Sequence, residues 1–278
     1  MIAKRLTGWV AAVGVMLWSA LAHAEAPHPW QMYFQPAASP VAERFHEFHA
    51  MLLVIITLIA GFVLALLLYV IVRFRASRNP VPSKTTHNTL IEVLWTVIPV
   101  IILVVVAIPS FKLLYYVDRA QNPEMTLKVT AHQWYWSYEY PDNGNFTFDS
   151  NLVQDADLKP GQLRLYEVDN HIVLPVDTTV RILVTSTDVM HSWFVPPLGV
   201  QMYAVPGRVN ETWVKVEREG IFHGQCNQIC GINHGFMPIE IEAISKDKFK
   251  AWTAAAQKKF ASVDGVPPVQ LAAGDRTQ

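Results

Sequence analysis

The stretch HGQCNQICGINHGFMP, residues 223–238, holds the only two cysteines of the 278-residue chain, Cys226 and Cys230. His234 follows four residues after the second cysteine, and Met237 follows three residues after that histidine. Thiolate, imidazole and thioether groups form a soft donor set, which suits copper better than magnesium or calcium. The spacing therefore predicts a soft-metal site in this loop.

The same residues fit two other structures. Cysteines four residues apart can form a disulfide in an oxidising compartment, or they can supply half of a zinc site. Zinc sites use four Cys or His ligands and have no role for Met237. A second imidazole is offered upstream by His191, within the segment DVMHSW at 188–193. The spacing alone leaves copper, disulfide and zinc open.

Composition limits the class of protein. Hydrophobic residues make up 51% of the chain, and they are clustered in a few runs, while the formal net charge is -1. A nearly neutral chain is not a bulk nucleic-acid binder. Recognition by charge must therefore come from local patches.

The N-terminus is typical of an exported protein. Lys4 and Arg5 precede an apolar stretch at 9–21, and Ala-His-Ala at 22–24 matches a signal-peptidase site. We interpret residues 1–24 as a signal peptide, cleaved after Ala24. Residues 25–47 contain four prolines and are interpreted as an exported leader segment on the membrane surface.

Residues 48–116 are predicted to form a transmembrane hairpin. The apolar runs 50–72 and 93–114 each have the length of one bilayer crossing. The short loop between them carries only positive charge up to residue 91, which marks the cytoplasmic side; its basic residues are Arg73, Arg75, Arg78 and Lys84. The N-terminal end of the first span and the C-terminal end of the second then lie outside the cytoplasm, in agreement with the signal peptide. Glu92 lies at the cytoplasmic end of the second span. An acid there either has a function near the membrane or stabilises the helix N-terminus through its interaction with the helix dipole.

After Asp118 the sequence changes to short runs rich in Val, Ile, Leu and Thr, separated by turn formers. Such a pattern indicates a β-sandwich or barrel; the predicted strands are 125–130, 163–168, 180–185, 211–216 and 238–244. Residues 246–260 are predicted to form a closing helix. Residues 261–278 are predicted to be a loose C-terminal tail.

Together with His-Ser-Trp at 191–193, the loop 226–237 resembles the CuA motif of cytochrome c oxidase subunit 2. The resemblance implies a membrane-anchored α+β protein, in which a two-helix transmembrane hairpin precedes a cupredoxin-like Greek-key sandwich at 117–260. It implies a binuclear copper centre, with these ligands: His191, Cys226, the backbone carbonyl of Gln228, Cys230, His234 and Met237.

Position 228 departs from the family pattern. The family has glutamate there, and its side chain also holds a magnesium or manganese ion at the contact with subunit 1. Gln228 offers a neutral amide, a weaker ligand for a hard cation. The carbonyl ligand is unaffected, but the second metal is in doubt.

An aromatic run, HQWYWSYEY at 132–140, also matches the family. Strand alternation predicts that Trp134, Trp136, Tyr138 and Tyr140 share one face. Rings in such a run are usually core or membrane-interface residues. The resemblance implies that Trp134 is instead the surface residue through which cytochrome c passes its electron.

Two further roles follow from the resemblance. Glu92, within IEVLWTVIP at 91–99, corresponds to the acid at the entrance of a proton path into subunit 1. An acid-rich stretch could steer a basic partner such as cytochrome c to the copper loops; the docking acids proposed are Glu139, Asp142, Asp149, Asp169 and Asp188.

The expected function is that of subunit 2 of cytochrome c oxidase. Such a chain takes electrons from cytochrome c at CuA and relays them to haem in subunit 1, where oxygen is reduced to water and protons are pumped. The expected partners are subunit 1, other oxidase subunits, cytochrome c and the bilayer. The expected location is a bacterial inner membrane, with the copper domain on the periplasmic side. The alternatives are a membrane-anchored copper chaperone or storage protein and a quinol oxidase subunit, whose relatives lack the copper ligands.

Overall fold

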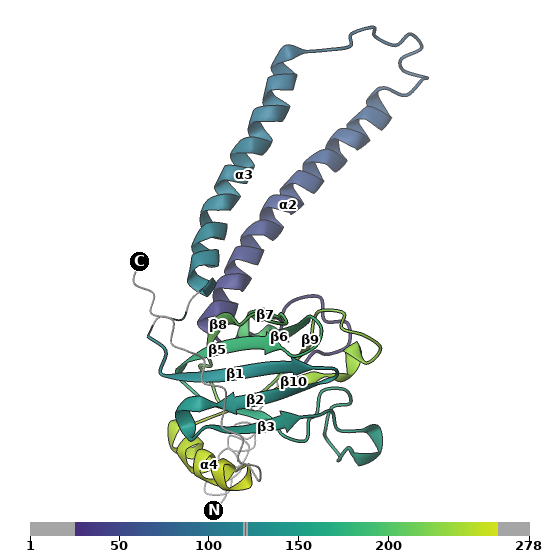
Figure 1. Cartoon of the computed structure of the whole chain (residues 1–278). Helices are drawn as coiled ribbons and strands as arrows, with labels where there is room; N and C mark the ends of the chain where they lie inside the picture. Colours follow the sequence, from purple (N-terminus) through teal and green to yellow (C-terminus); the bar gives the residue numbers. More distant parts are fainter. Residues whose placement is uncertain (1–25, 119, 121, 261–278) are drawn as a thin grey trace, which may run out of the picture.

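The computed structural model describes residues 26–118, 120 and 122–260. Two long helices rise from a β-sandwich, as Figure 1 shows. The predicted signal peptide 1–24 and tail 261–278 lie outside the described residues.

The two helices form an antiparallel hairpin (Figure 1). Helix α2 spans Pro40–Arg73 and helix α3 spans Thr89–Asp118, with mean hydropathies of 3.1 and 2.8 in their most apolar windows. No residue of the most apolar stretch of either helix is buried by the rest of the chain, and each helix is long enough to cross a bilayer. An apolar face of this size has to be covered by lipid or by other membrane helices.

Helix α2 begins inside the segment assigned to the leader, because local capping starts it there. The Ser39 side chain accepts a hydrogen bond from the amide of Ala42 at 3.0 Å, and Pro40 occupies the first helical turn. Serine caps and first-turn prolines both favour a helix start. The leader's last residues therefore belong to the first turns of the helix.

The hairpin is fastened to the sandwich at both of its outer ends. The Ser39 hydroxyl donates to the carbonyl of Leu198 at 2.7 Å. The Trp213 indole donates to the carbonyl of Tyr116 at 3.1 Å, and the two rings meet edge to face. The membrane anchor and the sandwich are therefore joined by direct contacts as well as by the chain.

Two five-stranded sheets make the sandwich (Figure 1). One has the order β3-β2-β1-β5-β8, with bounds Phe146–Ser150, Tyr135–Tyr140, Met125–His132, Thr179–Ser186 and Asn210–Lys215. The other has the order β4-β10-β9-β6-β7, with bounds Ile172–Pro175, Pro238–Ile244, Gly220–Cys226, His191–Val195 and Val200–Ala204. Each sheet contains one parallel pair, β1 with β5 and β4 with β10. The expected cupredoxin-like sandwich is confirmed.

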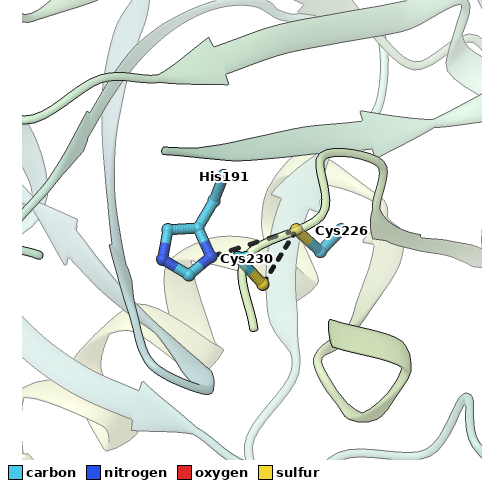
Figure 2. A group of neighbouring side chains, drawn as sticks. All are labelled: His191, Cys226 and Cys230. Atoms are coloured by element: carbon cyan, nitrogen blue, oxygen red, sulfur yellow. Dashed lines mark hydrogen bonds between the residues drawn. The ribbon is translucent and has the colours of Figure 1, made fainter. Parts of the chain in front are cut away.

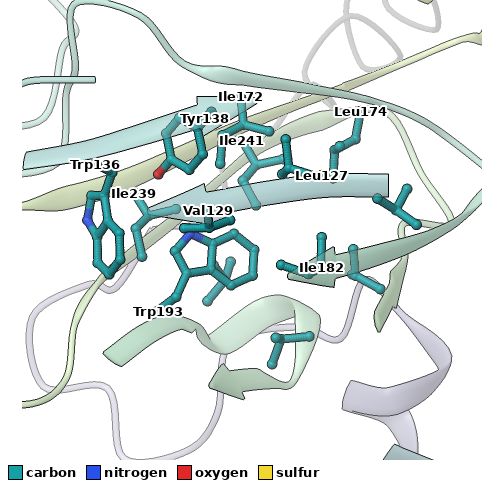
Figure 3. Close-up of a cluster of buried hydrophobic side chains, with 14 of the residues drawn as sticks. Leu127, Val129, Trp136, Tyr138, Ile172, Leu174, Ile182, Trp193, Ile239 and Ile241 are labelled. Carbon is teal, nitrogen blue, oxygen red and sulfur yellow. The ribbon is translucent and has the colours of Figure 1, made fainter. Parts of the chain in front are cut away.

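Large side chains from both sheets fill the space between them (Figure 3). Trp136, Tyr138 and Tyr140 alternate inward along β2, and each is at most 1% exposed. The Tyr140 hydroxyl crosses to the other sheet, where it accepts from the amide and donates to the carbonyl of Val173, both at 3.0 Å. A buried hydroxyl satisfied on both sides ties the two layers in register.

Helix α4, Lys246–Lys259, follows the last strand, as the sequence predicted. The Ser245 side chain caps it, accepting from the amide of Lys248 at 3.5 Å. Its residues Phe249, Thr253 and Ala256 are buried, at helical spacing. The helix thereby covers one end of the sandwich.

One predicted strand is wrong. Residues 163–168 form turns, because Leu165 has a left-handed backbone (φ 68°) and the amide of Tyr166 bonds back to the carbonyl of Leu163 at 3.1 Å. The Glu167 carboxylate accepts from the amide of Leu163 at 2.9 Å, which closes the same turn. Side-chain bonding of this kind competes with strand ladders.

The aromatic alternation needs one correction. The inward face is right for Trp136, Tyr138 and Tyr140, but β2 begins only at Tyr135. Trp134 lies in the turn that joins β1 to β2, so it does not share their face. The turn points the indole toward the loop that carries the cysteines.

Candidate metal centre

Strand pairing brings the donors together at one end of the sandwich. His191 opens β6 and Cys226 closes β9, and these antiparallel strands pair Trp193 with Cys226. Strands β9 and β10 form a hairpin with Pro238 opposite Gln225, so the intervening loop folds back beside its own start. In antiparallel neighbours, the start of one strand and the end of the other lie at the same end of the sheet.

A buried imidazole and two buried thiols form the centre of the site (Figure 2). The sulfur of Cys226 lies 3.9 Å from the sulfur of Cys230 and 3.9 Å from Nδ1 of His191. These three donor atoms all lie within 4.8 Å of one another. The sequence placed them 39 positions apart at most, and only the fold joins them.

The other predicted ligands surround the same sulfurs. Nδ1 of His234 lies 3.6 Å and Sδ of Met237 lies 3.5 Å from the sulfur of Cys230. The carbonyl oxygen of Gln228 lies 3.4 Å from the sulfur of Cys226. Each sulfur therefore has one imidazole and one further donor beside it.

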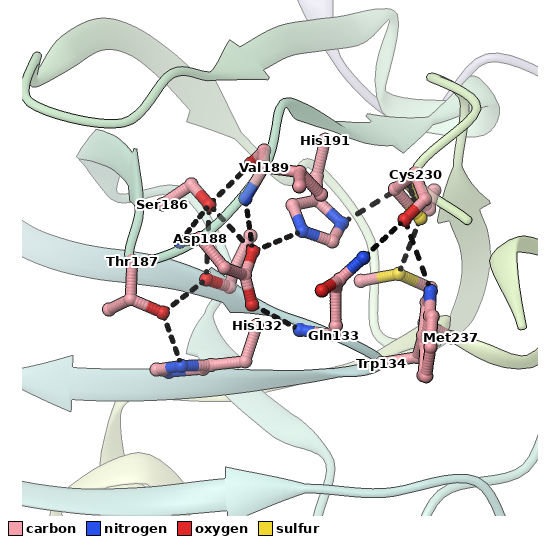
Figure 4. Close-up of polar contacts among 12 residues, drawn as sticks. His132, Gln133, Trp134, Ser186, Thr187, Asp188, Val189, His191, Cys230 and Met237 are labelled. Atoms are coloured by element: carbon pink, nitrogen blue, oxygen red, sulfur yellow. Dashed lines mark hydrogen bonds and ion pairs between the residues drawn. The ribbon is translucent and has the colours of Figure 1, made fainter.

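Asp188 fixes the orientation of His191 (Figure 4). Its Oδ1 is 2.9 Å from Nε2 of His191, and its Oδ2 accepts from the amide of Gln133 at 2.6 Å. A carboxylate on the far ring nitrogen selects the tautomer that leaves Nδ1 facing the sulfurs. Asp188, predicted as a docking acid, is thus an internal partner of a candidate ligand.

The β1–β2 turn of the other sheet closes over the cysteine loop (Figure 4). Nε2 of Gln133 and Nε1 of Trp134 donate to the same carbonyl oxygen, that of Cys230, at 2.8 and 3.3 Å. Gly231 makes this approach possible, since its φ of +128° is left-handed and a Cβ there would lie 2.9 Å from Cζ2 of Trp134. The β1–β2 turn and the cysteine loop are therefore complementary in shape and in hydrogen bonding.

Electrostatics at the two thiols differ. Burial opposes ionisation of Cys226, but hydrogen bonds donated to its sulfur by His191 and by the backbone at Gln228 and Ser192 outweigh burial and lower the pKa of this thiol. Burial, followed by the charge on Cys226, raises the pKa of Cys230 to about 12. Burial opposes the charged form of His191 as well, yet its bonds to Cys226 and Asp188 raise the pKa of the imidazole. One thiolate is balanced by the imidazolium, and a second would need further positive charge.

These properties discriminate among the three structures that the sequence left open. Both thiols are free, and a sulfur separation of 3.9 Å is far beyond the roughly 2.05 Å of a disulfide. Two soft thiols, two imidazoles and a 2%-exposed thioether fit a soft metal ion, which would supply the missing positive charge. A single tetrahedral zinc ion would leave Met237 without a role.

A second, hard-metal site at Gln228 is not supported. Among the described residues, the only cluster of three or more Asp, Glu, His or Cys donors is His191, Cys226 and Cys230. The Gln228 side chain lines a cleft of about 1210 Å³ whose wall includes the acids Asp118 and Glu211. Magnesium and manganese require several oxygen donors in close array, and that array is missing from the described part of the chain.

Glu92 lies away from the metal site, at the start of α3. Its Oε1 accepts from the amide of Asn88 at 3.3 Å, while Oδ1 of Asn88 accepts from the amide of Ile91 at 3.2 Å. This reciprocal pair satisfies free amides at the helix start, in the manner of a capping box. A capping role for the carboxylate is therefore present in the chain itself.

The predicted docking acids are all engaged within the chain. Their partners, at 2.6–2.9 Å, are Lys128 for Glu139, the Thr126 amide for Asp142, the Ser137 hydroxyl for Asp149, the Asn151 amide for Asp169 and His191 for Asp188. Asp142 contacts the start of β1, at the opposite end of the sheet from the Gln133–Trp134 turn. Asp169 instead holds Asn151, which lines a cleft of about 360 Å³ together with Trp134.

The sequence reasoning missed Gln133. Its amide and side chain join Asp188 to the carbonyl of Cys230, so one residue contacts both halves of the site. A polar side chain inside an aromatic run was the available signal. The three-residue spacing of Asp188 and His191 was a signal for the second missed role, the orientation of the imidazole.

Fold and site together define a membrane-anchored, cupredoxin-like protein with a buried Cys/Cys/His cluster able to hold a metal ion. Residues 125–244 match the family described as "Cytochrome C oxidase subunit II, periplasmic domain", and residues 27–113 match "Cytochrome C oxidase subunit II, transmembrane domain". The chain belongs to the cytochrome c oxidase subunit II family.

Individual relatives agree with this assignment. The probable cytochrome c oxidase subunit 2 of Rickettsia bellii is 51% identical over 253 residues, covering 91% of this chain and 94% of the relative. Cytochrome c oxidase subunit 2 of Oenothera berteroana is 48% identical, covering 87% and 96%. The solved periplasmic domain of subunit II of cytochrome oxidase (CoxB) from Bradyrhizobium japonicum is 46% identical, covers 51% of this chain and 99% of that domain, and has a TM-score of 0.48.

Proposed function

We propose that the chain is the electron-accepting subunit of a cytochrome c oxidase, with a binuclear copper centre held by His191, Cys226, the Gln228 carbonyl, Cys230, His234 and Met237. The observation that carries the proposal is the division of donors over two sulfurs. His191 lies by Cys226 and His234 lies by Cys230. Two thiols with an imidazole each suit a pair of soft ions better than one.

When bound, the copper pair supplies a one-electron redox centre. The surrounding residues hold its ligands still: Asp188 orients His191, and Gln133 and Trp134 fix the carbonyl of Cys230. Rigid outer contacts of this kind keep the ligand geometry the same in both oxidation states. The chain's own contribution is therefore to bind, orient and bury the centre.

Trp134 is the proposed point at which the electron enters. Its indole lines the 360 Å³ cleft at the surface and also contacts the Cys230 carbonyl inside. One residue thus joins the outer surface to the metal loop. Asp149 and Asp169 are the acids best placed to attract a basic cytochrome c to this cleft, because Asp188 is paired with His191 inside the site. Glu139 and Asp142 lie progressively farther along β1–β2 from the turn.

The electron would leave for haem in subunit 1, where oxygen is reduced to water and protons are pumped. Subunit 1 and other oxidase subunits are the proposed neighbours of the hairpin. The proposed location is a bacterial inner membrane, and the basic loop that joins the helices favours an orientation with the sandwich on the periplasmic side. Glu92 would then stand at the cytoplasmic end of α3, at the proposed proton entrance.

The alternatives are less well supported. A copper chaperone or storage protein needs an exposed, exchangeable site, whereas Cys226, Cys230, Met237 and His191 are at most 6% exposed. A quinol oxidase subunit would have no use for six converging copper donors. The buried and complete set of donors in this chain is what an electron-transfer centre requires.

Electron paramagnetic resonance of the oxidase complex tests the proposal. A signal from one unpaired electron shared by two coppers is expected, and Cys226→Ser and Cys230→Ser should each abolish it. An unchanged spectrum in both variants contradicts the site. A single-copper spectrum in the unmodified protein would instead indicate a mononuclear centre.

Met202→Leu is a matched control, because Met202 is a partly buried methionine packed against the core and outside the donor set. It should leave the spectrum intact. Met237→Leu removes the thioether at 3.5 Å from Cys230 and should alter the spectrum without removing both coppers.

A further inference from the structure

A groove of about 340 Å³ opens between α2 and α3, near the ends of the helices that meet the sandwich. Its floor is apolar and half-buried, and is made by Phe48, Met51, Pro109 and Leu113. Its rim is charged and exposed, and is made by Arg44, Glu47 and Lys112. Nothing in the proposed electron path uses this interhelical groove.

The rim charges are not neutralised by the chain. Within the part of the chain that the structure describes, Arg44, Glu47 and Lys112 form no side-chain hydrogen bond or ion pair. The Arg44 guanidinium lies over the ring of Tyr116, 3.5 Å from its centroid. Because the Tyr116 carbonyl is bound by Trp213 of the sandwich, this contact fixes the position of the guanidinium. Two cations and one carboxylate therefore face the groove with no charged partner.

The groove lies at the depth of a membrane surface. Arg44 and Glu47 precede the apolar run that begins at Ala50, while Met51 is inside it. At 1.5 Å of rise per residue, the rim stands roughly 5–9 Å outside the hydrocarbon and the floor at its boundary. Lys112 is near the end of the second run, where a lysine can extend its ammonium to the headgroups.

We propose that this groove binds one phosphatidylethanolamine molecule. Its phosphate would lie between Arg44 and Lys112, its ammonium would face Glu47, and an acyl chain would lie on the floor by Met51 and Pro109. A zwitterionic headgroup matches two cations plus one carboxylate, whereas a lipid with a phosphate alone leaves Glu47 unpaired. Ethanolamine offers N–H donors to a carboxylate and choline offers none, so the site distinguishes these two headgroups.

Photo-crosslinking in the assembled oxidase tests the proposal. The complex is placed in vesicles that contain either phosphatidylethanolamine or phosphatidylcholine with a photoreactive group on the acyl chain near the headgroup. Crosslinks should concentrate on the peptides around residues 48–51 and 109–113, with a higher yield for the ethanolamine lipid. Loss of charge-assisted bonds in Arg44→Gln/Lys112→Gln should reduce that yield roughly tenfold.

Three further variants sharpen the result. Lys112→Gln alone removes no contact seen in the chain, so its fold should be unchanged and its yield reduced. Glu47→Gln should keep lipid binding but erase the preference for ethanolamine over choline. Arg75→Gln/Lys84→Gln removes the same charge at the far end of the hairpin and should change nothing. Equal yields for both lipids in the unmodified complex, yields unaffected by the double variant, or no crosslink at these peptides would each overturn the proposal.

Discussion

The indole nitrogen of Trp134 lies 3.3 Å from the carbonyl oxygen of Cys230, so the aromatic turn of one sheet is hydrogen-bonded to the cysteine loop attached to the other. Gln133 donates to the same oxygen at 2.8 Å. The residue proposed to accept the electron is thus in direct contact with a candidate copper ligand. Its position depends on both sheets.

Trp134→Phe should slow electron transfer from reduced cytochrome c and leave the copper spectrum unchanged. Phenylalanine keeps an aromatic ring but loses the indole donor, while Gln133 still holds the Cys230 carbonyl. Stopped-flow oxidation of cytochrome c, alongside electron paramagnetic resonance, measures both. Trp252→Phe, in the closing helix, serves as the control and should keep the normal rate. A normal rate in Trp134→Phe would reject the role of Trp134.

Glu92 can be tested by separating its two roles. Glu92→Gln keeps an oxygen that can accept from the Asn88 amide, so the helix cap survives, whereas Glu92→Ala loses it. If the carboxylate carries protons, Glu92→Gln should already slow turnover and lower proton uptake, with unchanged cytochrome c binding. Loss of this hydrogen bond in Glu92→Ala should cost about 0.5–1.5 kcal/mol of stability. Normal turnover in the glutamine variant, with a defect only in the alanine variant, would assign Glu92 to capping alone.

Glu240 gives the sandwich a predictable pH dependence. It is 6% exposed, it accepts from the Val168 amide at 3.2 Å, and burial, followed by the charge of Glu167, raises the pKa of its carboxyl. A carboxyl whose pKa is higher in the folded state stabilises the fold below its ordinary pKa, and that stabilisation is lost as pH rises through the raised value.

Glu240→Gln keeps the acceptor and cannot ionise. The variant's advantage in Tm over the unmodified chain should therefore be larger at pH 8 than at pH 5, in thermal melts of the full chain. Glu217→Gln, at an exposed position, should show no such pH dependence. An advantage for Glu240→Gln that does not change with pH would contradict the buried-charge interpretation.

Docking by the acidic surface predicts a rate of cytochrome c oxidation that falls with salt. Exposed charges are screened over about 10 Å at 0.1 M ionic strength. Asp169→Asn, beside the Trp134 cleft, should lower the rate at low salt and flatten its salt dependence. Asp142→Asn removes the same charge at the far end of β1 and should have little effect. Equal effects of the two variants would show that the overall charge of the protein, and not the acids beside the Trp134 cleft, steers cytochrome c.

Local patterns of residues were sufficient to predict several elements of this protein. Two apolar runs separated by basic residues define the hairpin, and the spacing of Cys226, Cys230, His234 and Met237 is contained in one loop. Alternation along β2 placed Trp136, Tyr138 and Tyr140 inside, because successive strand residues face opposite sides. These features depend on neighbours a few residues apart.

Other features of the site depend on contacts between residues that are distant in the chain. Strand pairing brought His191 to Cys226, placed Trp134 in a turn over Cys230, and separated Asp142 from the metal end of the sheet. At residues 163–168, side-chain hydrogen bonds outweighed β-propensity and produced a turn. Burial opposes ionisation of both thiols, and the hydrogen bond from the distant His191 gives Cys226 the lower pKa. Such effects require contacts between residues that are far apart in the chain. A pattern of neighbouring residues contains no information about the distance between two residues that are distant in sequence.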